Sequence, residues 1–189
     1  VIAGLDRYDE GIIREANGLK VISRYGVGVD NVDLKAATES GIVVTLTPGA
    51  NTEAVADLAF ALMMASARNI VKADRLTREG GWPKMLGGSV WGKTVGVLGT
   101  GAIGRSFARR LAGFSAKVLL FDVRRDEEFA SSVGGKYVAL DEMLSESDFI
   151  SVHVPLNAAT KGLIGRREIS MMKPTSYIIN TARGGIVDE

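Results

Sequence analysis

Hydrophobic residues in the first part of the chain come in short runs separated by segments of helical periodicity. The apolar runs are "VIAGL", "KVISRYG" and "GIVVTL", and the segments between them are "DEGIIREA" and "VDLKAATES". Apolar runs of this length, alternating with amphipathic segments, are typical of parallel strands joined by helices. The pattern therefore predicts an α/β unit at the amino end of the chain.

A second alternating unit begins near residue 94. Its predicted strands are "TVGVLG", "AKVLLFD", "DFISVHVP" and "SYIIN", and its predicted helices lie at 103–113 and near "LDEMLSES" and "RREISMM". These strands are apolar over most of their length, as expected for a parallel sheet covered on both faces. The chain is therefore expected to be α/β, with a doubly wound parallel sheet in its second part.

One long helix and a loop separate the two units. Pro48-Gly49 interrupts the chain, Asn51 or Thr52 can cap a helix predicted over 52–79, and Gly80-Gly81 ends it. The following stretch "WPKMLGGSVWGK" reads as a loop. We place the boundary near residues 81–92, which gives predicted domains of 1–84 and 85–189.

Composition limits the kinds of partner. With 46% hydrophobic and 24% charged residues the chain has an ordinary globular composition, and a net charge of +1 does not suggest nucleic acid or a membrane surface. The absence of cysteine and the single histidine disfavour disulfides and a metal centre. The longest apolar run, Leu58–Ala67, is shorter than a membrane span. We expect a cytoplasmic protein with small-molecule partners, and both ends read as points inside a longer chain.

A glycine-rich turn follows the first strand of the second unit. In "VGVLGTGAIG", Gly99, Gly101 and Gly104 have the G-x-G-x-x-G spacing, and Ala102 and Ile103 begin the predicted helix. The first glycine permits a tight turn, the second lets a pyrophosphate approach the backbone, and the third lets helix and strand pack closely. The start of the helix adds free N–H groups. This context predicts a dinucleotide site.

An acidic residue ends the next strand. Asp122 follows "KVLLF", at about the spacing expected for the carboxylate that binds the adenosine ribose hydroxyls. A carboxylate there repels a 2′-phosphate, which favours NAD over NADP. Arg124 and Arg125 leave the alternative open, because basic residues after this strand suit an NADP site.

Five segments together resemble the D-isomer-specific 2-hydroxyacid dehydrogenases. They are residues 24–34, 47–58, 95–105, 149–160 and 178–189. The resemblance implies a Rossmann-like NAD-binding domain, truncated at its carboxyl end, preceded by part of a flavodoxin-like substrate domain. It also implies NAD as cofactor, a small 2-hydroxy or 2-oxo acid as substrate, and a homodimer in which helix 52–79 contributes to the interface.

The same resemblance assigns roles to particular residues. Val27 and Gly28 match backbone amides that meet the substrate carboxylate, and Val27 also matches a position near the nicotinamide. Arg183 matches the catalytic arginine, whose planar guanidinium holds the carboxylate and polarises the carbonyl. Thr181 and Ala182 match positions that line the nicotinamide, next to Arg183.

The only histidine is not expected to be the catalytic acid. His153, with Val154 and Pro155, matches a family position beside the cofactor, on the adenosine side. The family's proton-transferring histidine and its glutamate partner lie beyond the arginine motif, hence after Glu189. The 189 residues are therefore expected to bind cofactor rather than to turn over substrate.

The substrate is less well defined. D-3-phosphoglycerate is the first expectation, with Arg7 and Arg24 as candidate phosphate ligands or, equally, ordinary surface charges. The alternatives are a glyoxylate or hydroxypyruvate reductase and, from another class, a non-enzymatic NAD(H)-responsive protein like the corepressors that share these motifs.

Overall fold

The computed structural model describes residues 1–189 and divides into two compact units, Val1–Asn51 and Thr52–Glu189. The first unit is a three-stranded parallel sheet in the order β1-β2-β3, with two short helices. Its elements are β1 (Ile2–Ala3), α1 (Glu10–Glu15), β2 (Val21–Arg24), α2 (Leu34–Glu39) and β3 (Val43–Thr45). Both helices are capped by the aspartate that precedes them, since Asp9 and Asp33 accept hydrogen bonds from the N–H groups of Ile12 and Ala36.

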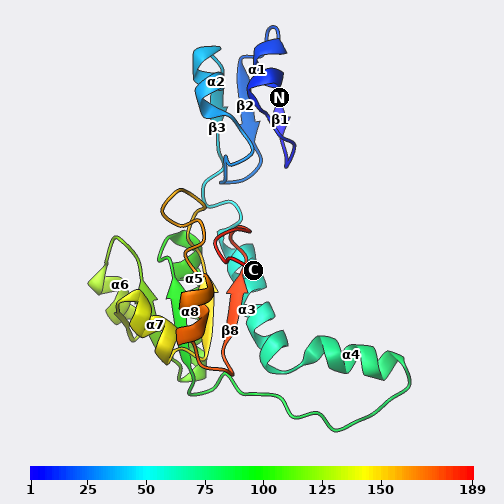
Figure 1. The fold of residues 1–189 in the computed structure, drawn as a ribbon, viewed down its shortest axis with the longest axis vertical. Helices are drawn as coiled ribbons and strands as arrows, with labels where there is room; N and C mark the ends of the chain where they lie inside the picture. The colour runs from blue at the N-terminus through cyan, green and yellow to red at the C-terminus, as the bar shows by residue number, and fades with distance from the viewer. The chain divides into compact units, whose positions relative to one another are not determined.

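The second unit contains a five-stranded parallel sheet in the order β6-β5-β4-β7-β8. Figure 1 shows it with β8 labelled and with helices packed beside it. The strands are β4 (Thr94–Leu98), β5 (Lys117–Phe121), β6 (Gly135–Tyr137), β7 (Phe149–Val152) and β8 (Tyr177–Asn180). The chain runs outward from β4 to β6 on one side and returns to β7 on the other. This reversal beside β4 confirms the doubly wound sheet, and ligands of such sheets bind outside the carboxyl ends of the strands at this point.

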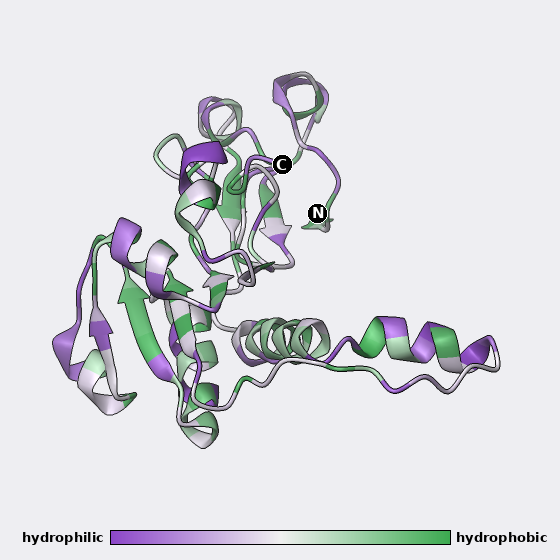
Figure 2. Cartoon of the chain, turned by 60° about the horizontal axis from the view of Figure 1, so that its bottom comes forward, coloured by the Kyte–Doolittle hydropathy of each residue, from purple (hydrophilic) through white to green (hydrophobic).

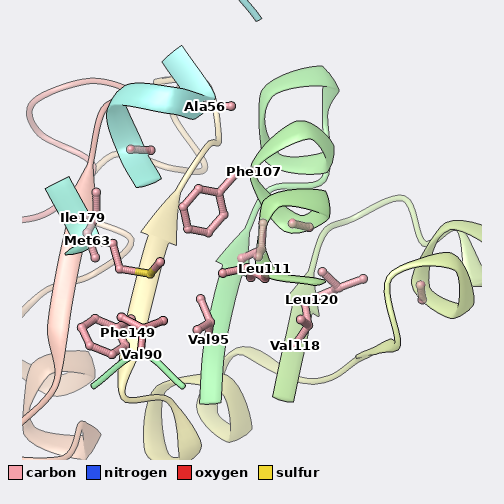
Figure 3. Packing of buried hydrophobic residues seen from close by; sticks show 14 of the residues in the cluster. Ala56, Met63, Val90, Val95, Phe107, Leu111, Val118, Leu120, Phe149 and Ile179 are labelled. Carbon is pink, nitrogen blue, oxygen red and sulfur yellow. The ribbon is translucent and has the colours of Figure 1, made fainter. Parts of the chain in front are cut away.

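Helices cover both faces of this sheet. They are α3 (Thr52–Ala67), α5 (Ala102–Arg110) with a 3₁₀ turn at Leu111–Phe114, α6 (Glu127–Ser132), α7 (Leu140–Glu146) and α8 (Arg166–Met171). Phe107 of α5 is fully buried between the strands and α3 (Figure 3). A second apolar cluster includes Met143 of α7 and Ile150 of β7. Because both faces are covered, the central strands are buried and apolar over most of their length, as the sequence indicated, with Ser151 of β7 as a buried polar residue.

The predicted single helix over 52–79 is wrong, because the structure has two helices there. α3 ends at Ala67 and α4 (Ile70–Arg78) begins after a bend of 66°. Asn69 adopts a left-handed conformation with φ of 54°, and its side-chain amide donates to the carbonyl of Leu86 at 3.1 Å. Asparagine tolerates this conformation better than most residues, so it ends α3 where the chain near Leu86 crosses it.

α4 and the segment after it bury little of their surface. No residue of α4 is buried, and Figure 2 shows hydrophobic and hydrophilic residues alternating along it. Trp82 and Leu86 are exposed to 90% and 86%. No single helix is long and apolar enough to cross a membrane, and α3 and α4 pass that test only as a bent pair.

The boundary between the units lies at Asn51, earlier than the predicted boundary after residue 84. The reason is that α3 packs on the second unit. Ala56 and Met63 are fully buried in its core, and the hydroxyl of Ser106 donates to the Glu53 carboxylate at 2.6 Å. A strand and a helix that the sequence pattern did not reveal, β6 and α6, also belong to this unit.

Candidate functional site

The turn after β4 brings three parts of the chain into close contact. Gly99 has φ of 97°, and a Cβ atom there would lie 2.8 Å from the carbonyl carbon of His153 and 2.9 Å from Cγ1 of Val154. A Cβ on Gly104 would collide with the carbonyl oxygen of Gly99. Glycine is therefore required at both positions by the packing of β4, α5 and the end of β7.

Gly101 differs from its two neighbours in the motif. Its φ of −68° suits any residue, and a Cβ there would meet nothing within 4 Å. It caps α5 without a side-chain hydrogen bond, so the N–H groups at the start of the helix, at Ala102 and Ile103, have no side-chain acceptor from the cap. Packing therefore does not explain this glycine, and the start of α5 beside it is open space.

Asp122 follows β5 at the same edge of the sheet. Its Oδ2 atom accepts from the N–H of Thr100 at 2.6 Å and from the Thr100 hydroxyl at 3.1 Å, and its Oδ1 atom accepts from the N–H of Arg124 at 3.0 Å. Partial burial alone would raise the pKa of this carboxyl, but the N–H donors of Arg124 and Thr100 outweigh it and lower the pKa below 3.8. The carboxylate is therefore ionised at neutral pH.

Two arginines follow Asp122 in the sequence, and a third, Arg105, contacts the glycine turn. Arg124 and Arg125 are exposed in the loop after β5. Arg105 is already engaged, since its Nη1 atom lies 2.8 Å from Oδ2 of Asp126 and its Nε donates to the carbonyl of Thr100 at 2.9 Å. The basic side chains in the loop are thus separate from the arginine that supports the glycine turn.

His153 lies directly behind the glycine turn. Its Nε2 atom is 2.8 Å from the hydroxyl of buried Ser151, and its ring centroid is 5.2 Å from that of Phe107. Burial lowers the pKa of the imidazole to about 4. After it, Val154 packs on the second apolar cluster and Pro155 is exposed. At neutral pH this histidine is an uncharged packing residue.

The turn after β8 is ordered by one asparagine. Asn180 accepts from the N–H of Ala182 at 3.0 Å and donates to the carbonyl of Arg183 at 2.9 Å. The Arg183 guanidinium donates to the carbonyl of Ala182 at 2.8 Å, and Thr181 has a buried hydroxyl oxygen without a hydrogen-bond partner in the protein. Because β8 is parallel to β7, this turn leaves the same edge of the sheet as the glycine turn.

Val27 and Gly28 belong to the first unit, in the turn after β2. The neighbouring Gly26 has φ of 143°, and its N–H and carbonyl bond to the hydroxyl and the N–H of Thr47, both at 3.0 Å. Val27 itself is partly exposed. The structure therefore describes a glycine-rich turn that is held by Thr47, just after β3, and that exposes Val27.

The two arginines considered as phosphate ligands are placed very differently. Arg24 is only 6% exposed, and its guanidinium donates to the Asn31 side chain at 3.2 Å and to the carbonyl of Tyr25 at 2.8 Å. Arg7 is exposed and lies 3.9 Å from Asp9. Arg24 has a packing role inside the unit, and Arg7 is a surface charge.

Two residues that contact the site were missed by the sequence analysis. Thr100 bonds to Asp122, and the Tyr137 hydroxyl lies 2.9 Å from the Thr100 hydroxyl. Thr100 occupies a position of the glycine motif that any residue can fill, so the motif does not predict a role for its side chain. Tyr137 reaches the site only because β6 pairs with β5, and that strand was not predicted.

Comparison with known proteins identifies the domain that contains this turn. Residues 60–189 match the model of the D-isomer specific 2-hydroxyacid dehydrogenase, NAD binding domain. The matched domain confirms the cofactor expected from the glycine turn and Asp122.

Individual relatives are similar over nearly the whole chain. A glyoxylate reductase of Korarchaeum cryptofilum is 46% identical over 190 residues, which are 97% of this chain and 57% of that protein. A D-3-phosphoglycerate dehydrogenase of Archaeoglobus fulgidus is 45% identical over 191 residues, 100% of this chain and 36% of that protein. The NAD-dependent formate dehydrogenase of Staphylococcus aureus, solved with NAD, superposes with a TM-score of 0.89 at 35% identity, covering 99% of this chain and 58% of that one.

Proposed function

The chain belongs to the D-isomer specific 2-hydroxyacid dehydrogenase family, and from that premise we propose that the full-length protein is an NAD-dependent oxidoreductase of small 2-hydroxy and 2-oxo acids. Two features found together carry the proposal. Gly101 leaves open space at the start of α5, and Asp122, which follows the neighbouring strand β5, is ionised. The chain spans 57% of the glyoxylate reductase and 36% of the phosphoglycerate dehydrogenase that it resembles.

The cofactor would be held by groups that the structure leaves available. The N–H groups of Ala102 and Ile103 and the dipole of α5 favour the pyrophosphate beside Gly101. Asp122 accepts a hydrogen bond from the adenosine ribose, and Thr181 offers a buried hydroxyl without a protein partner on the nicotinamide side. Bound there, NADH supplies the hydride for reduction of the substrate carbonyl.

Arg183 is proposed to bind the substrate. A guanidinium holds a carboxylate through two parallel hydrogen bonds and polarises the neighbouring carbonyl, which favours hydride addition at the carbonyl carbon. The Asn180 hydrogen bonds fix the turn that carries this arginine at the carboxyl edge of the sheet. In the first unit, the N–H groups of Val27 and Gly28 are proposed, from the family resemblance, to be donors to a carboxylate.

The proposed substrate is a small 2-oxo acid such as glyoxylate or hydroxypyruvate, ahead of 3-phosphoglycerate. This reverses the order expected from the sequence. The support is the 46% identity to a glyoxylate reductase, together with the engagement of Arg24 by neighbouring carbonyl groups inside the first unit. Of the two arginines considered as phosphate ligands, only Arg7, which lies on the surface, remains a candidate.

No proton-transfer role is proposed for His153. Its pKa of about 4, caused by burial, keeps the imidazole neutral at the pH of the cytoplasm and removes it as an acid. The proton is proposed to come from a residue outside 1–189, in agreement with the family resemblance.

We also propose that the full-length protein is a homodimer that uses α4 and the segment after it. The support is the exposure of large apolar side chains there, since Val71, Trp82 and Leu86 are 77%, 90% and 86% exposed. An apolar surface of this kind is typical of a subunit interface.

The test of the activity is a substrate panel with the full-length protein. Oxidation of NADH is followed by absorbance with glyoxylate, hydroxypyruvate, pyruvate and 3-phosphohydroxypyruvate, and reduction of NAD with the corresponding D-2-hydroxy acids. We expect turnover with glyoxylate or hydroxypyruvate. Saturable NADH binding without turnover on any of these acids would rule out the proposed activity while leaving the cofactor site intact.

A further inference from the structure

A chain of hydrogen bonds through the hydroxyl groups of Tyr137 and Thr100 ends on the Asp122 carboxylate. The Thr100 hydroxyl oxygen lies 3.1 Å from Oδ2 of Asp122 and 2.9 Å from the Tyr137 hydroxyl oxygen. The Thr100 N–H donates to the same Oδ2 at 2.6 Å. Thr100 and Tyr137 are 4% and 9% exposed, so both hydroxyls make these contacts inside the protein.

The chemistry of the three groups fixes the direction of the chain. An ionised carboxylate only accepts, so the single hydroxyl proton of Thr100 points to Asp122. The Thr100 oxygen must then accept the proton of the Tyr137 hydroxyl, which satisfies that buried hydroxyl. Tyr137 therefore polarises the Thr100 hydroxyl, and Thr100 strengthens its bond to the carboxylate.

The two oxygens of Asp122 are used unequally. Oδ2 receives two hydrogen bonds from Thr100, whereas Oδ1 receives one, from the N–H of Arg124. Each carboxylate oxygen has about two acceptor positions. Oδ2 is therefore filled and Oδ1 keeps one position for a ligand, in a carboxylate whose rotation is fixed.

We propose that Thr100 and Tyr137 are positioning residues that set the preference of this site for NADH over NADPH. They hold the ionised Asp122 in one orientation, so that Oδ1 accepts from a ribose hydroxyl and the fixed negative charge repels a 2′-phosphate. The inference rests on the proposed function, because it assumes that the adenosine ribose of the cofactor meets Asp122.

The basic residues nearby explain why fixing the carboxylate affects selectivity. Arg105 pairs with Asp126 and bonds to the carbonyl of Thr100, so it supports the turn. Arg124 and Arg125 are exposed beside Asp122 and carry the charge that a 2′-phosphate needs. Without the Thr100 hydroxyl the carboxylate keeps its bonds to the N–H groups of Thr100 and Arg124 but is held less firmly, and the two arginines then favour NADPH more than in the parent protein.

The experiment measures the dissociation constants of NADH and NADPH for the full-length protein, by fluorescence titration at one pH and ionic strength. The variants are Thr100→Val, which keeps the shape and the N–H but loses the hydroxyl, Thr100→Ser, which keeps the hydroxyl, and Tyr137→Phe. The substitutions at Thr100 and Tyr137 are repeated with Asp122→Asn. Tyr177→Phe is the matched control, because Tyr177 begins β8 at the opposite end of the sheet.

We expect Thr100→Val to reduce the preference for NADH by about tenfold and Tyr137→Phe by about threefold, in line with the loss of a hydrogen bond to a charged group and of its neutral neighbour. Thr100→Ser keeps the preference for NADH of the parent protein, and so does Tyr177→Phe. In the Asp122→Asn protein, Thr100→Val and Tyr137→Phe have no effect on the preference. A merely structural role would weaken NADH and NADPH binding alike.

The outcomes separate the two proposals. If the parent protein prefers NADH and both Thr100→Val and Tyr137→Phe keep that preference, the positioning role is wrong. If the parent binds neither cofactor, the proposed function itself fails. Tyr137→Phe removes one oxygen at an outer strand, so it decides the matter alone if thermal melting shows that Thr100→Val does not fold.

Discussion

The imidazole of His153 and the hydroxyl of the fully buried Ser151 form a partly buried polar pair, with 2.8 Å between Nε2 and Oγ. Burial lowers the pKa of His153 from 6.5 to about 4. Between these pH values the unfolded chain binds a proton that the folded chain does not, so the free energy of unfolding falls as the pH falls from 6.5 to 4. The shift corresponds to about 3 kcal/mol over the whole window.

The prediction is that His153→Gln flattens this pH dependence. Guanidinium unfolding between pH 5 and 7 would measure it, because the carboxyl groups whose pKa is lowered in the folded protein, such as Asp122, Asp148 and Glu53, lose their contribution mainly below this range. A parent protein whose stability is constant from pH 6.5 to 5 would show that His153 is not buried in this way.

Substitution by alanine should affect different properties at two glycines of the same motif, namely NADH binding at Gly101 and thermal stability at Gly99. Gly101→Ala adds a methyl group to open space at the start of α5, so we expect unchanged thermal stability and weaker NADH binding. Gly99→Ala places its Cβ 2.8 Å from the carbonyl carbon of His153 at φ of 97°, so the protein should unfold at lower temperature. Gly113→Ala, also facing open space, is the control that should change neither property. Tight NADH binding by Gly101→Ala would remove the pyrophosphate assignment.

The parts of the site that the sequence predicted are those whose signal is local. Gly99, Gly101 and Asp122 are recognisable because each is defined by its position after an apolar strand. The structure places the glycine turn and Asp122 within hydrogen-bonding contact through Thr100. Strand ends carry this information because parallel strands bring their carboxyl ends to one edge.

The parts that were missed depend on contacts between distant segments. β6 is the three-residue segment "GKY", which has no apolar run, and it exists because Val118 to Leu120 of β5 pair with it. The break at Asn69 likewise depends on the crossing chain at Leu86. Neither contact can be predicted from the periodicity of the sequence. The contact of Tyr137 with Thr100 could therefore be identified only from the structure.

Packing between β4 and α7 supplies a prediction on stability. A Cβ on Gly96 would lie 2.7 Å from Cγ of Met143 and 2.8 Å from Oγ of Ser147, so Gly96→Ala should destabilise the fold by about 1–3 kcal/mol through overpacking. The Ser147 hydroxyl is buried without a partner, so Ser147→Ala alone should leave the melting temperature unchanged or raise it. Thermal melting of both variants checks this. Marked destabilisation by Ser147→Ala would reveal a hydrogen bond to that hydroxyl.

If the protein is a dimer through α4 and the segment after it, a charged residue placed on α4 should lower the mass of the particle in solution. Val71 of α4 is 77% exposed, and Val71→Asp should convert a dimer into monomers, because an unpaired carboxylate is costly in an apolar interface. Light scattering of the full-length protein measures the mass. Val123→Asp, at a 93% exposed position after β5, is the matched control. A monomeric parent protein would remove the interface.

Arg183 gives the sharpest test of the chemistry. Each hydrogen bond from a guanidinium to a charged group is worth about 1.5–3 kcal/mol, so losing two should lower kcat/KM by roughly 10²–10⁴-fold in Arg183→Ala. Arg183→Lys keeps the charge but not the planar fork and should recover only part of the loss. Arg166→Ala, at an exposed position that begins α8, is the control and should leave the rate unchanged. Steady-state kinetics with glyoxylate and a separate NADH titration distinguish substrate from cofactor effects. If Arg183→Ala weakened NADH binding alone and left kcat/KM at saturating NADH unaltered, Arg183 would belong to the cofactor site rather than to the substrate.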